Sequence, residues 1–231
     1  YYVDEVLNGY SKGYLTMLMG VLLISQLLGM LVFGPIMTKT SKKATILIGA
    51  PIRIVCTLGL LAFSYEGAPI APILALSAGV GIGNAATLTS IFAILADMAD
   101  VDELITSVSR PGIVSGMATF ARKISAGLSA WVIGLLISFA GYDAGIAKAG
   151  LRQSLHTQNG IAMIFIFLPV ILVTLLLIFG YMFPITKKEF ELVHKEIARR
   201  KGEDDSEATE EEKKILKRVT GIEYEQLWGN R

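Results

Sequence analysis

The segment "QNGIAMIFIFLPVILVTLLLIFGYMFP" at residues 158–184 contains no Asp, Glu, Lys or Arg. A helix that crosses the hydrocarbon core of a bilayer needs about 20 mostly apolar residues, and this segment exceeds that length. Each apolar run in the chain is apolar on all sides rather than alternating, which favours helices over a β-barrel. The sequence therefore predicts an all-α integral membrane protein with five transmembrane helices, at residues 14–37, 44–65, 71–96, 112–140 and 158–184.

The composition agrees with this fold class. Hydrophobic residues make up 53% of the chain and the mean hydropathy is +0.57, whereas a soluble domain would show amphipathic periods. The single Cys56 excludes an intramolecular disulfide. The opening residues "YYVDEVLNGY" have no initiator Met or basic n-region and are not a signal peptide. We predict that residues 1–13 are the end of a preceding helix and an external loop, and that the chain is a piece of a longer protein.

Basic residues predict the orientation, because Lys and Arg concentrate in cytoplasmic loops. They follow the first predicted span in "TKTSKK" (38–43), the third at Arg110 and the fifth in "TKKEFELVHKEIARRK" (186–201). With five spans these three regions share one side of the membrane. We therefore predict a plasma or inner membrane protein whose tail, residues 185–231, is cytoplasmic.

The tail contains one clear helix signal. In "ATEEEKKILKRVTG" (208–221), Thr209 and Glu212 have the spacing of a capping box and Gly221 is placed to end the helix. Its apolar edge predicts a short amphipathic helix docked on the cytoplasmic face of the protein. A regulatory or partner-binding tail is the alternative.

Ionisable residues inside a span are candidates for function because placing one there is costly. Arg53 lies ten residues beyond Lys43, about 15 Å into the membrane at 1.5 Å per residue. Lys123 reaches a similar depth, and the adjacent Arg122 points about 100° away from it. Milder polar residues, expected mainly to form hydrogen bonds between helices and otherwise to line a cavity, are Asn84, Thr87, Thr119 and Gln26.

Small residues are frequent in the same spans. "SAGVGIGNAA" at residues 77–86 is the densest example. Its glycines lack the preceding strand and the spacing of a nucleotide-binding loop. Small residues let helix backbones approach closely in a membrane, so we predict that this segment is a packing surface.

The stretch "ADMADVDELITSVSRPGIVSG" at residues 96–116 holds the acids Asp97, Asp100, Asp102 and Glu103. Asp97 and Asp100 share one face at the end of the third span, where acids oppose the helix dipole, and Arg110 is their nearest basic partner. A metal-dependent intramembrane transferase would also need a DG…AR element and a further D-x3-D, which the chain lacks. A cation site is a second possibility. We favour a clasp in which acids and Arg110 hold helix ends together as a cytoplasmic gate.

This acidic stretch, with "ARKISAG" (121–127) and "GYDAG" (141–145), resembles the glycoside–pentoside–hexuronide:cation symporters, the melibiose permease-like branch of the major facilitator superfamily. The chain departs from their pattern at Val101, Ser107 and Pro111, which replace an aromatic residue, a Gly and a Glu. The resemblance covers nearly the whole chain and implies the C-terminal six-helix half of a transporter, with about five complete spans present. It places Lys123 where these symporters carry a Lys that faces the central cavity. Arg53 has no counterpart in the pattern.

The resemblance implies a protein that is not an enzyme and that transports a sugar or glycoside together with Na⁺ or H⁺ by alternating access. The predicted substrate and cation cavity includes Lys123, Thr119, Asn84 and Arg53, and the predicted gate includes Asp97, Asp100, Glu103 and Arg110. The expected partners are membrane lipid, the missing N-terminal half and the sugar, with no nucleic acid, metal site or cofactor beyond the coupling ion. A lysolipid or amphiphile carrier on the same scaffold and an intramembrane transferase are the alternatives.

Overall fold

The computed structural model describes residues 1–8, 13–149, 151–182 and 187–229. Five of its helices are long and apolar enough to cross a membrane. The all-α prediction is confirmed, and the described residues contain no strand. The long helices are α1 (Tyr14–Lys39), α2 (Lys42–Gly59, continued by the 3-10 turn Leu60–Phe63), α3 (Ile70–Thr106), α4 (Pro111–Phe139) and α6 (Leu155–Met182). The predicted end of the fifth span at residue 184 and the start of the tail at residue 185 lie outside the described residues.

Helix α3 extends ten residues beyond the end of its predicted span, which was residue 96. It continues through the acidic stretch to Thr106 because the intervening sequence contains no Gly or Pro. Ser107 then adopts a left-handed conformation with φ of 61°, and Pro111 begins α4 at a position that suits its fixed φ. The acids therefore lie within a helix rather than in a loop between two spans.

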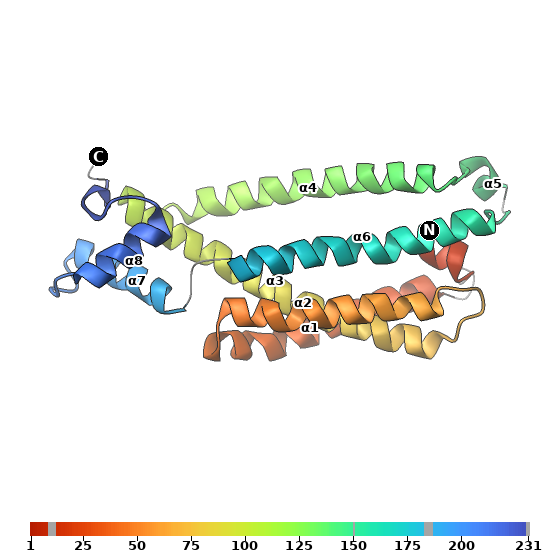
Figure 1. The fold of residues 1–231 in the computed structure, drawn as a ribbon, viewed down its shortest axis with the longest axis horizontal. Helices are drawn as coiled ribbons and strands as arrows, with labels where there is room; N and C mark the ends of the chain where they lie inside the picture. The colour runs from red at the N-terminus through yellow and green to blue at the C-terminus, as the bar shows by residue number, and fades with distance from the viewer. Residues whose placement is uncertain (9–12, 150, 183–186, 230–231) are drawn as a thin grey trace.

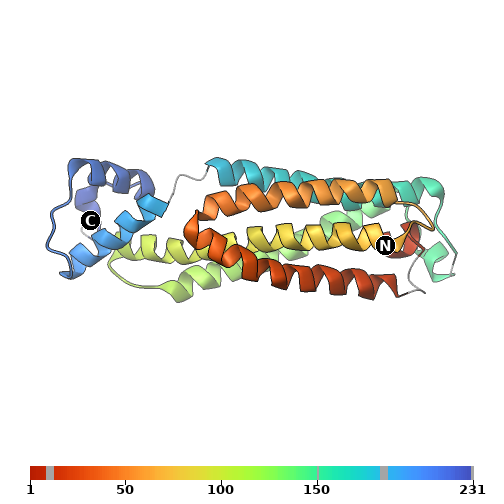
Figure 2. The same cartoon turned by 90° about the horizontal axis from the view of Figure 1, so that it is seen from below.

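Helix α3 packs against both α1 and α2, and α6 packs against α2. Figures 1 and 2 show these helices running along the long axis of the molecule. Helix α4 makes fewer contacts with its neighbours, and Ile137 is its one buried residue among those described. Helix α4 therefore presents most of its surface away from this chain.

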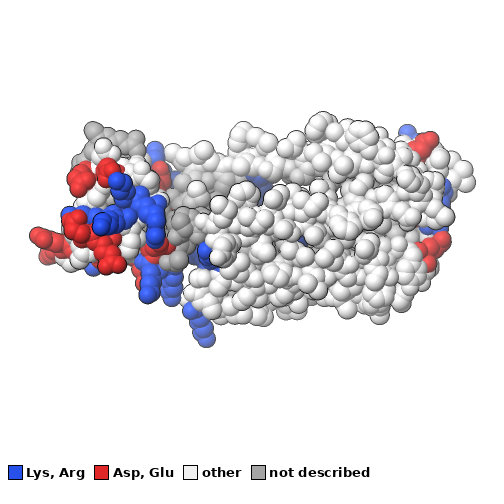
Figure 3. All heavy atoms as spheres, viewed as in Figure 1, with Lys and Arg blue, Asp and Glu red and all other residues white. Residues whose placement is uncertain are grey.

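The three basic regions predicted to share one side do lie at the same end of the bundle (Figure 1). At that end are the α1–α2 turn, the α3–α4 turn and the tail. Charged side chains gather mainly there, with a smaller group at the opposite end and a belt between them that carries few charges (Figure 3). Exposed Leu, Ile, Val and Phe side chains cover the belt, as expected for a surface that faces lipid.

The tail forms a small helical unit with its own apolar core. It contains α7 (Lys187–Lys201), α8 (Glu210–Thr220) and the 3-10 turn Tyr224–Gln226. The predicted capping box of Thr209 and Glu212 is present, and Gly221 ends α8 in a left-handed conformation. The core also includes a residue of α3, so the tail is docked on that helix; its buried members are Leu104, Val193, Ile197, Leu216 and Leu227.

Short elements occupy the opposite end of the bundle. A π-helix, Tyr2–Val6, stands where the sequence analysis expected the end of a helix, and α5 (Ala144–Lys148) lies in the connection between α4 and α6. Asp143 caps α5 by accepting a hydrogen bond from the Gly145 amide. Helix α6 begins at Leu155, three residues before the predicted span.

Candidate functional site

Close packing of α1, α2 and α3 begins at the glycines of the small-residue segment. A Cβ atom on Gly81 would lie 2.6 Å from the Leu22 carbonyl oxygen of α1, and one on Gly83 would lie 2.6 Å from the Gly49 carbonyl oxygen of α2. Only glycine permits such contacts, and they draw the backbones of both neighbours onto α3. This confirms that the segment is a packing surface.

This close approach assembles three polar side chains from three helices, which we name the mid-helix cluster: Gln26, Arg53 and Asn84. Arg53 Nη1 donates a hydrogen bond to Asn84 Oδ1 at 2.8 Å, and Asn84 Nδ2 donates one to Gln26 Oε1 at 2.8 Å. The interhelical hydrogen bonds expected of Asn84 and Gln26 are therefore present. Arg53 Nε is buried, and it has no hydrogen-bond partner among the described residues.

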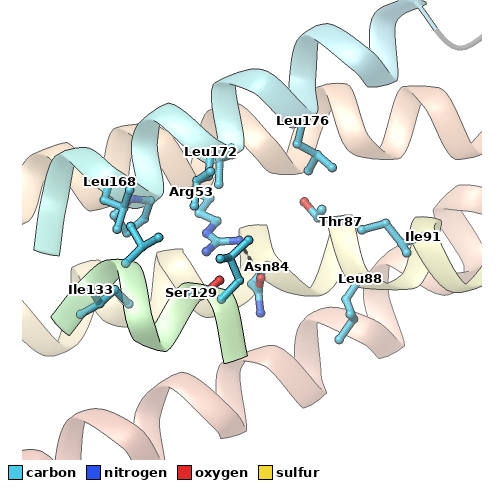
Figure 4. A pocket seen from close by; sticks show the side chains of 14 residues that line it. Arg53, Asn84, Thr87, Leu88, Ile91, Ser129, Ile133, Leu168, Leu172 and Leu176 are labelled. Carbon is cyan, nitrogen blue, oxygen red and sulfur yellow. Dashed lines mark hydrogen bonds between the residues drawn. The ribbon is translucent and has the colours of Figure 1, made fainter. Parts of the chain in front are cut away.

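Arg53 and Asn84 border a cavity of about 560 Å³ between α2, α3, α4 and α6. Figure 4 shows the Arg53 side chain pointing into the cavity, with its hydrogen bond to Asn84. Thr87 also lines the cavity, while its hydroxyl donates to the Gly83 carbonyl oxygen within α3. Within the described residues Arg53 is the sole charged side chain of the wall, whose other members are Leu88, Ile91, Leu128, Ser129, Val132, Ile133, Leu168, Pro169, Leu172, Val173 and Leu176.

A second cavity, of about 430 Å³, adjoins the first and is almost entirely apolar. The two share the wall residues Ile133, Leu168 and Pro169. Tyr2, whose ring stacks on Phe165 with 4.1 Å between ring centroids, lines the second cavity. The two cavities together follow the space between α4 and α6 towards the end opposite the tail.

The structure does not bring Lys123 and Thr119 to this cavity. Both residues, and Arg122, are exposed on α4, and the residues that α4 contributes to the wall begin at Leu128. Ser129, which lines the cavity, was not predicted, because its span is rich in small residues and nothing in the sequence distinguishes this one. A part for Lys123 and Thr119 in substrate or cation binding stays a prediction.

The acids near the end of α3 form a second group, which we name the helix-end cluster: Asp97, Asp100, Asp102 and Glu103. Each acid faces a different base. Asp97 pairs with Lys42 of α2, and Asp100 lies 3.6 Å from His194 of α7. Glu103 pairs with Lys201 of α7 at 2.6 Å.

The expectation that Arg110 pairs with Asp97 and Asp100 is wrong. Arg110 instead binds Asp102 through two hydrogen bonds of 2.8 and 3.1 Å, from Nη2 and Nε. Because α3 continues to Thr106, its acids point in several directions around the helix, and Asp102 is the one on the side of the turn to α4. The sequence did not predict that the acids pair with Lys42, His194 and Lys201, because the helices that carry these bases come near the acids only after folding.

The tail carries a further ionic group that sequence analysis missed. Glu196 is fully buried and accepts hydrogen bonds from Arg199 and Arg200 at 3.2 and 2.9 Å. Arg199 also binds Glu212 at 2.9 Å and so joins α7 to α8. The i, i+3 and i, i+4 spacing of these residues in "KEIARR" was the available signal.

Hydrogen bonding holds the pKa of the Glu212 carboxyl at about 2. The largest cause is the hydrogen bond from the Thr209 amide, and Arg199 and Lys195 add to it. The hydrogen bond that the exposed Lys201 ammonium group donates to the Glu103 carboxylate raises the pKa of Lys201. The charged forms of these tail residues are therefore the ones that the folded structure favours.

In the part of the chain that the structure describes, no three His, Cys, Asp or Glu side chains are grouped so that they could hold a metal ion. The acids of the helix-end cluster face Lys, Arg or His side chains instead. The arrangement thus ties helices and tail together.

The long apolar helices, the belt that carries few charges and the cavity between the helices define a multi-pass α-helical membrane protein. The chain belongs to the family described as "MFS/sugar transport protein", which it matches over residues 1–187. It is 26% identical to the glucuronide carrier protein homolog of Escherichia coli (strain K12) over 206 residues, 87% of this chain and 42% of that protein. It is 32% identical to the putative sulfoquinovose importer of the same organism over 125 residues, 52% of this chain and 24% of that protein.

The chain thus spans less than half the length of these curated relatives. No solved structure matches it significantly. The family and its relatives confirm the resemblance to the glycoside–pentoside–hexuronide branch of the major facilitator superfamily. They also support a transporter rather than an enzyme, so the intramembrane transferase hypothesis is set aside.

Proposed function

We propose that this chain is the C-terminal six-helix half of a secondary transporter that moves a sugar or glycoside together with Na⁺ or H⁺. The observation that carries the proposal is a cavity of about 560 Å³ within the span region of a family of sugar transport proteins. Its volume lies in the range of small-molecule sites, about 300–1,000 Å³. Substrate sites of such transporters lie near the bilayer midplane between two repeats, which is where rocking of the halves gives alternating access.

The names of the relatives support a sugar as cargo. One is named for a glucuronide and the other for sulfoquinovose. Both names denote acidic sugars, one a carboxylate and the other a sulfonate. Acidic sugars therefore belong among the first substrates to test.

The helix-end cluster is proposed as the cytoplasmic gate. Its ion pairs join α3 to α2 through Asp97 and Lys42, to the start of α4 through Asp102 and Arg110, and to the tail through Glu103 and Lys201. A gate of this kind holds one conformation by pairs that separate in the other. The proposed orientation has this end in the cytoplasm of a plasma or inner membrane, because it carries most of the basic residues.

An amphiphile carrier is the second candidate. The almost wholly apolar cavity that adjoins the first one favours it, since an acyl chain would find a suitable surface there. A competition experiment distinguishes the candidates. A lysolipid that is transported inhibits sugar uptake with a defined inhibition constant. A lysolipid that is not transported leaves sugar uptake unchanged at lysolipid concentrations below the micellar concentration.

The test of the proposal uses the full-length protein in sealed proteoliposomes. An imposed Na⁺ or proton gradient is expected to drive a labelled sugar to a higher concentration inside than outside, and an ionophore that collapses the gradient is expected to abolish the accumulation. Lys123→Ala is expected to abolish coupled uptake, with Arg122→Ala as the matched control on the same helix. Uptake that never exceeds equilibration under any gradient would contradict cation coupling.

The gate has a separate test. Asp97→Asn is expected to shift the balance of inward- and outward-open states, while changing substrate affinity little. Labelling of single cysteines placed on the cytoplasmic side reports that balance. Equal labelling rates in the variant and the wild type would remove Asp97 from the gate.

A further inference from the structure

Arg53 carries a charge that no acidic side chain in the described part of the chain neutralises. A guanidinium group remains protonated at any physiological pH. No Asp or Glu forms an ion pair with Arg53 among the described residues, and no acid lines its cavity. Arg53 is partly buried, and a partly buried charge without a counter-charge is unfavourable, so the site suits a negative group that comes from elsewhere.

The hydrogen-bonding capacity of Arg53 is also largely unused. A guanidinium group has five N–H donors. One donor binds Asn84, and Nε is buried with no partner in the described part of the chain. Arg110, Arg199 and Arg200 each bind at least one carboxylate, whereas Arg53 has no carboxylate partner among the described residues.

The guanidinium group is held in a fixed orientation before anything binds. Asn84 accepts from Arg53 and donates to Gln26, so the amide cannot turn without losing both hydrogen bonds. The close contact of Gly83 with Gly49 sets the distance between α2 and α3 on which this chain of hydrogen bonds depends. Such preorganisation reduces the entropy cost of binding.

The surroundings of Arg53 strengthen its attraction for an anion. The cavity wall is mainly Leu, Ile and Val, and a low-dielectric wall weakens electrostatic screening. A planar guanidinium group matches the two oxygens of a carboxylate or sulfonate, with which it forms paired hydrogen bonds. The volume of about 560 Å³ admits a monosaccharide or a small glycoside.

We propose that Arg53 binds an oxyanion of the transported sugar and thereby selects acidic sugars over neutral ones. The inference rests on the proposed sugar transport and adds to it a specificity-determining residue and a substrate charge. Two other sources of an anion exist, an acidic side chain in the rest of the full-length protein and a lipid phosphate. The experiment separates both from the sugar.

The experiment measures uptake of matched methyl glycosides by the full-length protein in phosphatidylcholine vesicles. Each pair differs only by a carboxylate in place of the hydroxymethyl group: glucuronide and glucoside, galacturonide and galactoside. The wild type is expected to prefer the acidic member. Arg53→Gln is expected to reduce the ratio of acidic to neutral uptake by about 10- to 100-fold, the range for a charged hydrogen bond.

Two further variants keep the test decisive. Arg53→Lys retains the charge but not the planar guanidinium group, and it is expected to keep part of the preference for the acidic sugar. If Arg53→Gln fails to fold, the ratio of acidic to neutral uptake in Arg53→Lys tests the proposal. Arg122→Gln removes a charge from another spanning helix, outside the cavity wall, and is expected to leave the ratio unchanged.

Three results would overturn the inference. A wild type that prefers neutral sugars would refute it while leaving sugar transport intact. Equal loss of acidic and neutral uptake in Arg53→Gln would assign Arg53 to an internal ion pair, or to lipid if uptake also required phosphatidylglycerol in the vesicles. Failure of the wild type to transport either member of any pair would refute the proposed sugar transport itself.

Discussion

Helix α3 contributes to two polar clusters that differ in how their charges are neutralised. In the helix-end cluster, four acids each face a base supplied by α2, the start of α4 or the tail. In the mid-helix cluster, the neutral amide of Asn84 is the one side chain among the described residues that binds the cation Arg53. A charge that is paired with an opposite charge in the same chain joins helices together. A charge that lies beside a cavity without such a partner is available for a ligand.

The largest expected effect tests whether the tail depends on its internal ion pairs. Glu196→Ala removes a fully buried carboxylate and leaves Arg199 and Arg200 without that partner. Loss of one member of a buried pair costs about 3–5 kcal/mol, so the tail is expected to undock. Faster tryptic cleavage within α7 and α8 would report this.

Glu191→Ala is the matched control, because Glu191 is exposed on the same helix. Sugar binding at the mid-helix cluster is expected to persist in both variants. Undiminished protection of the tail in Glu196→Ala would show that its apolar core alone holds it.

The next effect concerns the mid-helix cluster. Gly83→Ala places a methyl group 2.6 Å from the Gly49 carbonyl oxygen and 2.7 Å from the Arg53 amide nitrogen, both backbone atoms that cannot move aside alone. Overpacking of this kind costs about 1–3 kcal/mol. The thermal unfolding midpoint of the full-length protein in detergent is expected to fall.

Gly20→Ala on α1 supplies the control, since its Cβ would have no atom within 4 Å. Equal midpoints for the two variants would mean that α2 and α3 do not approach as closely as described.

A smaller effect concerns the charge of Glu212, whose pKa is held at about 2, below its ordinary value of 4.5. A lowered pKa in the folded state stabilises the tail above the ordinary value, and this contribution is lost as the pH falls through about 2. Glu212→Gln keeps a capping residue but not the charge. The wild type is expected to exceed it in tail stability by about 1 kcal/mol at pH 6, and the difference is expected to vanish near pH 2.

Fluorescence of Trp228, whose amide donates to the Leu104 carbonyl oxygen at 2.9 Å, can report tail docking. The measurement needs a variant in which Trp228 is the only tryptophan. A difference between Glu212→Gln and the wild type that did not depend on pH would contradict the assignment of the effect to charge.

The smallest effect concerns Arg110 and Asp102, which are 39% and 29% exposed. Exposed ion pairs contribute about 0.2–1 kcal/mol, so Arg110→Ala is expected to change the unfolding midpoint little. If the pair belongs to the gate, the variant nevertheless changes the cysteine labelling rates on the proposed cytoplasmic side. A large loss of stability would show that the turn between α3 and α4 depends on this pair.

The helical membrane fold and most of the polar residues that form the two clusters could be predicted from the amino-acid sequence. Long apolar runs are sufficient for this, because a membrane span must satisfy its backbone hydrogen bonds within itself. Arg53, Asn84 and Gln26 stood out because polar groups are rare in such runs, and the acids stood out for the same reason. The capping box of Thr209 and Glu212 was predictable because its hydrogen bonds are local in the chain.

The partner of each polar residue, by contrast, depends on how the helices pack in three dimensions. Asp97 binds Lys42 and not Arg110 because the pairing depends on helix length and rotation, and α3 runs past its predicted end to Thr106. Asn84 joins Arg53 to Gln26 because the contacts of Gly81 and Gly83 bring three helices together there. Contacts between segments far apart in sequence are set by packing in three dimensions, and that packing is what leaves Arg53 charged, oriented and facing a cavity.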